Sequence, residues 1–239
     1  RRTKPSTQFK GRGHIARKVI ATAKEQLQSK VTDLASWKTG KLNAEQLEQS
    51  IVSADELAEY ALAHGAYVYA QNKLSILIEQ LIELPALEKL GHAYDQAMNE
   101  YTPSYPPQSP VTRSYFTCWG SFDLVTRGAK KESMTSIAVD FCRFMQVDDS
   151  LLGLYENLER SRMGIYRHEG CEEEFVHLTE LVTNRKIKAV RTTNYEGNAG
   201  ELHPLPEPGQ AGDERLRVFR AVVYPREQRV LHRNAAPLP

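Results

Sequence analysis

The stretch MGIYRHEGCEEEFVHLTELVT, residues 163–183, decides the fold class because its side-chain spacing differs from that of the chain before it. Apolar side chains alternate roughly in twos over residues 163–168 and again over residues 174–183, with a polar segment at 169–172 between them. Alternation in twos is typical of a half-buried strand. Two such runs around a short polar segment predict a β-hairpin with residues 169–172 at its tip.

The short period continues toward the C-terminus. A turn at 183–186 leads into IKAVR (187–191), and LRVFRAVVY (216–224) with RVLHR (229–233) predict a closing hairpin. We therefore expect a small antiparallel β-meander over about residues 163–233.

Before the hairpin, apolar side chains recur every three to four residues, which is the period of an amphipathic helix. Ser53 and Glu56 form the S-x-x-E pattern of a capping box, and one long helix is expected from there to the residue before Pro85. Pro85 fits the first turn of a further helix, which is expected to end at about Tyr101. Residues 12–101 are thus predicted to be almost wholly helical.

The segment TPSYPPQSP, residues 102–110, has four prolines in nine residues, which favours an extended linker. We predict that it separates the helical region 12–101 from an α+β region, residues 111–239. Residues 1–11 are basic and unpatterned, and they are expected to form a flexible arm.

Within the α+β region, SYFTCWGSFDL (114–124) is read as an apolar segment that docks on the core, with a strand as one possible form. Helices are expected at about 131–145 and 149–160, the second capped by Asp148 or Asp149. The predicted fold class is therefore α+β. An N-terminal helical bundle or hairpin region precedes two helices and a small antiparallel β-meander.

The hairpin tip contains the residues that most resemble a metal site. His168, Cys171 and His177 are spaced H-x2-C-x5-H, but zinc sites usually show paired short spacings and a fourth ligand, which is absent nearby. On a strand, His177 would also face away from the core. We interpret the segment as a solvated tip and retain these three residues only as weak metal candidates.

Nucleophilic or acid–base catalysis finds little support. Cys118 and Cys142 lie among apolar residues and have no local base, and the chain has no G-x-S-x-G, H-E-x-x-H or phosphate-binding loop. Asp123 lies in an apolar stretch, where an ion pair with Arg113 or Arg127 would explain it. We predict no catalytic residue and no cofactor, with an enzyme built on an unrecognised site as the second alternative.

Nucleic-acid binding is the first alternative. The formal net charge of +1 conceals a basic N-terminal arm and arginine-rich C-terminal strands, which could neutralise phosphates. Against it, no standard nucleic-acid motif is present. The candidate contacts are Arg12, Arg17, Lys18, Arg185, Lys186, Lys188, Arg191, Arg217 and Arg220.

The helical region also carries aromatic residues that its apolar stripe leaves outward. These are Tyr60, Tyr67, Tyr69 and Tyr94. Because aromatics are enriched at protein interfaces, they favour self-association, with a dimer as the simplest form, or a protein partner.

Three separate cysteines and no apolar run of membrane-spanning length predict a protein of the bacterial-type cytoplasm without membrane contact. The main hypothesis is a non-enzymatic binding or scaffolding protein that acts by surface recognition.

Overall fold

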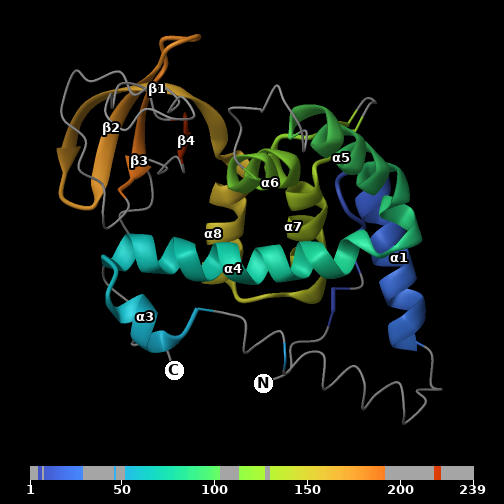
Figure 1. Ribbon diagram of the computed structural model, residues 1–239. Coiled ribbons are helices and arrows are strands. Elements are labelled where there is room, and N and C mark those ends of the chain that lie inside the picture. Colours follow the sequence, from blue (N-terminus) through green and yellow to red (C-terminus); the bar gives the residue numbers. More distant parts are fainter. Residues whose placement is uncertain are drawn as a thin grey trace. The chain divides into compact units, whose positions relative to one another are not determined.

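The computed structural model describes residues 5–6, 8–28, 46, 52–102, 113–126, 130–191 and 218–221. They fold into two compact units, residues 1–159 and residues 160–239. The first unit is helical and the second contains an antiparallel sheet, which confirms the predicted α+β class (Figure 1).

The described helices of the first unit follow one another with short connections. They are α1 (His14–Gln28), α3 (Ala54–Ala58), α4 (Leu62–Ile82), a 3-10 turn (Pro85–Leu87), α5 (Glu88–Tyr101), α6 (Arg113–Phe122), α7 (Met134–Met145) and α8 (Asp149–Arg160), whose last residue opens the second unit.

Helix α7 lies at the centre of the first unit. It packs against α1, α4 and α6, and Figure 1 shows α4 running across it. Ile137, Ala138 and Val139 have no exposed surface, so this helix is buried on more than one side. Ser133 and Ser136 close its N-terminus with a reciprocal pair of hydrogen bonds, a capping-box arrangement.

The helix starts predicted from local patterns are present. Ser53 and Glu56 form the predicted capping box, and Pro85 opens the turn that leads into α5. The expected single long helix is, however, interrupted: α3 ends at Ala58 and α4 begins at Leu62. The turn between them is closed by short-range bonds from the Glu59 amide to the carbonyls of the preceding turn.

The apolar segment 114–124 is helical over most of its length, so its interpretation as a strand was wrong. Phe116 and Phe122 are buried, and the ring of Phe116 lies 5.2 Å from that of Tyr94 on α5. The segment packs between α5 and α7, where a helix supplies its own backbone hydrogen bonds and can bury its aromatic side chains.

The division between the units falls later than the boundary we predicted. The proposed linker, residues 102–110, lies outside the described residues. Helices α7 and α8, which we assigned to the C-terminal region, belong with the first unit because α7 buries its surface against α1 and α4. The Asn157 amide of α8 likewise donates to the Tyr67 hydroxyl of α4, at 3.0 Å.

The predicted flexible arm is also different where it is described. The amide of Ser6 donates to the carbonyl of Phe144, at 2.7 Å, close to the C-terminus of α7. The Lys24 ammonium donates to the carbonyl of Phe9. These contacts fasten the described part of residues 5–11 onto α7 and α1, since they satisfy backbone groups at both places.

The second unit is a four-stranded antiparallel sheet of strand order β3-β2-β1-β4. Its strands are β1 (Arg162–Glu172), β2 (Phe175–Glu180), β3 (Lys186–Val190) and β4 (Val218–Ala221). The predicted hairpin is confirmed as β1–β2, and the turn predicted at 183–186 joins β2 to β3. The segment 229–233 lies outside the described residues.

The two faces of the sheet differ in chemistry. One face carries the apolar cluster Tyr166, Val176, Leu178 and Ala189, with Ile187 packed against it. The other face carries charged side chains, among them Lys188, which lies over the ring of Phe175 at 4.5 Å from its centroid.

Candidate functional site

The hairpin tip lies further along the chain than predicted. Glu172 pairs with Phe175, so Glu173 and Glu174 form the turn, and Glu173 has a positive φ of 49°. Residues 169–171 belong to β1, which contains a bulge between His168 and Gly170.

The weak metal candidates do not gather into one site. His177 lies 3.1 Å from a Glu172 oxygen, whereas His168 lies 3.3 Å from the sulfur of Cys171. Within the described ranges, no group of three or more His, Cys, Asp or Glu side chains comes close enough to hold a metal ion. His168 is 2% exposed, so the interpretation of the whole segment as solvated was wrong for this residue.

An exposed charge network occupies the other face of the tip. Glu172 contacts both His177 and Lys188, the latter at 2.9 Å. Its pKa is lowered by the hydrogen bonds from Lys188 and His177 and by the charge of Lys188. Lys188, one of the predicted nucleic-acid contacts, thus already has an acidic partner.

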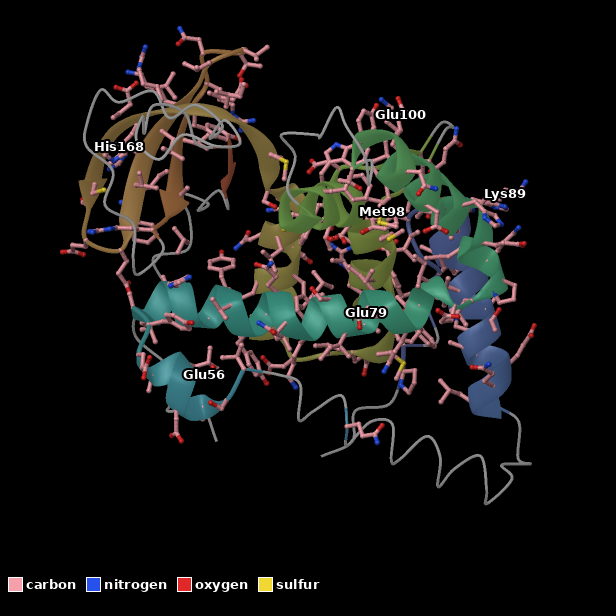
Figure 2. All side chains as sticks on the ribbon, in the orientation of Figure 1. Glu56, Glu79, Lys89, Met98, Glu100 and His168 are labelled. Atoms are coloured by element: carbon pink, nitrogen blue, oxygen red, sulfur yellow. The ribbon has the colours of Figure 1, made fainter. Side chains whose placement is uncertain are left out.

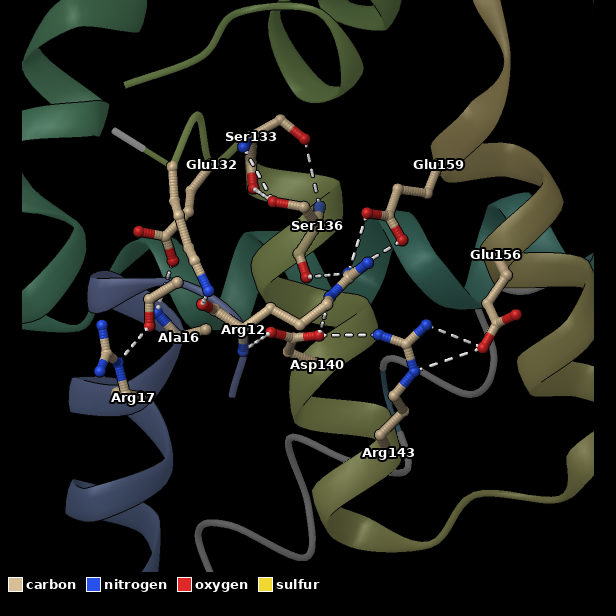
Figure 3. Close-up of polar contacts among 12 residues, drawn as sticks. Arg12, Ala16, Arg17, Glu132, Ser133, Ser136, Asp140, Arg143, Glu156 and Glu159 are labelled. Carbon is tan, nitrogen blue, oxygen red and sulfur yellow. Dashed lines mark hydrogen bonds and ion pairs between the residues drawn. The ribbon is translucent and has the colours of Figure 1, made fainter. Parts of the chain in front are cut away.

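A second network lies in the first unit and surrounds Asp140, a carboxylate that is 1% exposed (Figure 3). Arg12 donates to it from its backbone amide and from Nε, both at 2.6 Å. Arg143 donates from Nη1, at 2.8 Å. The arginines continue to two further carboxylates, with Arg12 on Glu159 and Arg143 on Glu156.

Glu132 fastens the same N-terminal segment from the other side (Figure 3). Its carboxylate accepts from the amides of Ile15 and Ala16, at 3.0 and 2.9 Å, and so caps the first turn of α1. Gly13 permits this approach, because a Cβ at that position would lie 1.9 Å from the carboxyl carbon of Glu132. We name Arg12, Glu132, Asp140 and Arg143 the latch.

The latch has the chemistry of a structural site. Burial acts to lower the pKa of Arg12, but Glu159 and Asp140 raise it overall, so the guanidinium stays charged. A carboxylate that already accepts from charged arginines and backbone amides is a weak general base. Cys142 on α7 is no better suited to catalysis, because burial raises its pKa to about 12.

The basic residues predicted to contact nucleic acid fall on both units. Arg12 is held in the latch, and the Nε of Arg17 donates to the carbonyl of Gly13. Lys18, Arg185 and Lys186 are exposed, whereas Arg191 is partly buried and donates its amide to Glu174. Arg217 lies outside the described residues, and so does the side chain of Arg220 on β4. Their role in nucleic-acid binding stays a prediction.

The aromatic residues expected on the outside of the helices are partly internal. Tyr67 is 7% exposed and accepts from Asn157, so its outward placement was wrong. Tyr94 packs on Phe116, and Tyr60 lies against the ring of His64. Self-association through the helical region therefore stays a prediction with fewer aromatic side chains to support it.

An exposed apolar group that the sequence analysis missed lies at the other end of the β1–β2 hairpin. Ile165 and Leu181 are opposite one another, joined by the bond from the Leu181 amide to the Ile165 carbonyl. They are 41% and 39% exposed, and the neighbouring Val182 is 84% exposed. We name Ile165, Leu181 and Val182 the sheet patch. Alternation in twos could have placed Ile165 opposite Tyr166, on the outer face.

The sequence matches no protein-family model, and neither curated proteins nor solved structures show a significant similarity to it. None of the described helices combines the length and apolar composition that crossing a bilayer requires.

Proposed function

We propose that this chain is a binding protein without enzymatic activity, and that the sheet patch recognises an apolar surface of a protein partner. The observation that carries the proposal is Val182, which is 84% exposed at the turn after β2 and adjoins the Ile165–Leu181 pair. An antiparallel sheet that covers one face usually presents polar side chains on the other. Exposed apolar groups that break this pattern mark interaction sites.

The turn that presents Val182 is held in place. The Glu180 carboxylate accepts from the amides of Val182 and Thr183, at 3.3 and 2.6 Å, and from the Thr183 hydroxyl. Asn184 completes the turn with a positive φ of 56°. A preorganised apolar anchor loses little conformational entropy on binding.

The energetics suit a recognition anchor. Complete burial of one Val, Leu or Ile side chain stabilises a complex by about 1.5–3 kcal/mol. The charged side chains beside the sheet patch, Arg167 paired with Glu169, would form the polar rim that usually surrounds such an anchor.

Site-specific photo-crosslinking in the producing cells tests the proposal. We expect a photo-crosslinking residue at Val182 to give a discrete protein adduct that disappears when Leu181→Glu is added. The control places the same residue at Ser75, an exposed position on α4. Absence of an adduct at Val182, or the same adduct from Ser75, would contradict the proposal.

Sedimentation velocity separates a second copy of this chain from a different partner. If the partner is a second copy, Val182→Glu shifts a concentration-dependent dimer to monomer. Leu62→Glu serves as the matched control, since Leu62 is 64% exposed but lies on α4 in the other unit. A crosslinked adduct from a protein that sediments as a monomer identifies a different partner.

A further inference from the structure

His168 and Cys171 form a side-chain pair on β1 that is separate from the sheet patch. The Nε2 atom of His168 lies 3.3 Å from the sulfur of Cys171. His168 is buried within the sheet, where Figure 2 labels it, whereas Cys171 is exposed. The imidazole is thus shielded from water while it contacts a thiol that solvent reaches.

The strand is irregular at the point where these residues meet. Side chains three positions apart on a regular strand point to opposite faces. Across the bulge, His168 pairs with Leu178 and Cys171 pairs with Val176, which are two positions apart and share a face. Gly170 makes this possible, because its φ of +149° is one that other residues rarely adopt. Bulges commonly re-aim side chains beside functional sites.

The surroundings leave the imidazole as the base beside the thiol among the described residues. From β2 and β3, this face presents the apolar side chains Val176, Leu178, Ile187 and Ala189. The neighbouring acidic residues of β1 make their contacts on the other face, Glu169 with Arg167 and Glu172 with Lys188. The thiol–imidazole hydrogen bond therefore lies in a region of low polarity, where such a bond is strong.

We propose that Cys171 is a reactive thiol whose proton His168 accepts, and that small hydroperoxides oxidise it to a sulfenic acid. The pair has the nucleophile-and-base arrangement of covalent chemistry, with the two heavy atoms in hydrogen-bond contact. Exposure of the sulfur admits the oxidant, and sensor cysteines combine thiolate character with access.

The reaction balances with the hydroperoxide as the only co-reactant. The thiol proton passes to Nε2 of His168, and the sulfur attacks the terminal oxygen of the hydroperoxide. A sulfur–oxygen bond forms as the oxygen–oxygen bond breaks, so sulfur is oxidised and the peroxide is reduced. The leaving alkoxide, or hydroxide from hydrogen peroxide, takes the proton from the imidazole and departs as an alcohol or water.

Alkylation of the full chain by iodoacetamide tests the activation by His168. The rate at Cys171 is followed by peptide mass spectrometry in the wild type, in His168→Gln and in His177→Gln, the matched control on β2. At near-neutral pH we expect His168→Gln to slow alkylation by about tenfold, because the thiolate fraction falls. The control should leave the rate unchanged. Equal rates in all three proteins would overturn the proposal.

A comparison within the wild type remains decisive if the buried substitution prevents folding. We expect Cys171 to be alkylated about tenfold faster in the folded protein than in the urea-denatured chain, where its thiol is ordinary. An equal or slower rate in the folded protein would overturn the proposal.

The oxidation is tested with hydrogen peroxide and a 1,3-dione that traps sulfenic acids. The expected result is an adduct on Cys171 in the wild type that is strongly reduced in His168→Gln. Absence of an adduct on Cys171, or equal labelling in the variant, would overturn the assignment of a hydroperoxide-reactive thiol.

Discussion

Asp140 in the first unit and Glu172 in the second each hold two basic side chains, but they differ in exposure. The side chain of Asp140 is 2% exposed and that of Glu172 is 60% exposed. Asp140 accepts from two arginines and from a backbone amide, whereas Glu172 accepts from His177 and Lys188 at the surface. Water and salt screen the exposed pairs but reach the buried carboxylate poorly.

The comparison teaches that burial decides which charge network holds the fold. Loss of Asp140 would leave two guanidinium groups and one amide without their acceptor, and part of that cost cannot be recovered by hydration. Loss of Glu172 would leave His177 and Lys188 in water, where each is well solvated.

The largest effect is expected from Asp140→Ala. It should lower the free energy of unfolding by about 3 kcal/mol, measured by urea denaturation followed by circular dichroism. Asp140→Asn should cost less, since the amide oxygen still accepts one hydrogen bond. An unchanged urea midpoint in Asp140→Ala would show that the latch does not hold the first unit together.

The next effect concerns the cap of α1. Glu132→Ala should cost about 1–2 kcal/mol, because the Ile15 and Ala16 amides lose their acceptor. Gly13→Ala should cost a similar amount, since its Cβ displaces the carboxylate. The two changes act on one contact, so the double variant should cost clearly less than their combined effects. Full additivity in the same urea assay would contradict this description of the cap.

A smaller effect is expected at the turn that presents Val182. Hydrogen bonds from the Thr183 hydroxyl and amide lower the pKa of Glu180, so Thr183→Val should raise that pKa toward the ordinary value of about 4.3. Carboxyl chemical shifts followed by NMR measure the change, with Glu172 as an internal control.

The direction of the pH dependence follows from the same shift. A carboxylate whose folded pKa is lowered stabilises the fold fully above its unfolded pKa, and loses this contribution as pH falls through the folded pKa. Thr183→Val should therefore reduce the sensitivity of the turn to acid. A titration of Glu180 that is identical in wild type and variant would remove the hydrogen bonds as the cause.

The smallest effect should come from Glu172→Ala. We expect its urea midpoint to match that of the wild type, at low and at high salt, because its partners are exposed. A clear loss of stability in this variant would mean that the exposed network contributes as the buried one does, and would break the comparison.

Local signals in the sequence were sufficient for much of the fold. The capping box at Ser53, the proline at 85 and the cap at Asp148 each act within a few residues, and the structure has helices at all three places. The change of period near residue 163 likewise located the sheet. These features are predictable because the interactions that stabilise them are local.

The features that were missed depend on distant partners. Arg12 is 128 positions from Asp140, and Glu132 is 116 positions from Ala16, so no spacing pattern connects them. The aromatic segment of α6 resembles a strand until α5 and α7 are present to cover it. The break after Ala58 is also silent, since residues 59–61 include neither glycine nor proline.

The candidate sites were the hardest to predict. The sequence analysis treated His168 and Cys171 as tip residues because regular alternation places them on opposite faces. The bulge that brings them together adds one residue to β1, and its sequence signal is the single Gly170. The sheet patch depends on exposure, which the pattern of a strand indicates only when its partner strand and register are known.

The latch also determines when the first helix can be completed during synthesis. An isolated helix of the length of α1, 15 residues, is marginal in water. The residues that cap and anchor it, at positions 132 and 140, leave the ribosome more than a hundred residues after it does. The beginning of this chain must therefore wait for its middle, and a nascent chain released before α7 would expose the apolar stripe of α1 to other unfinished chains.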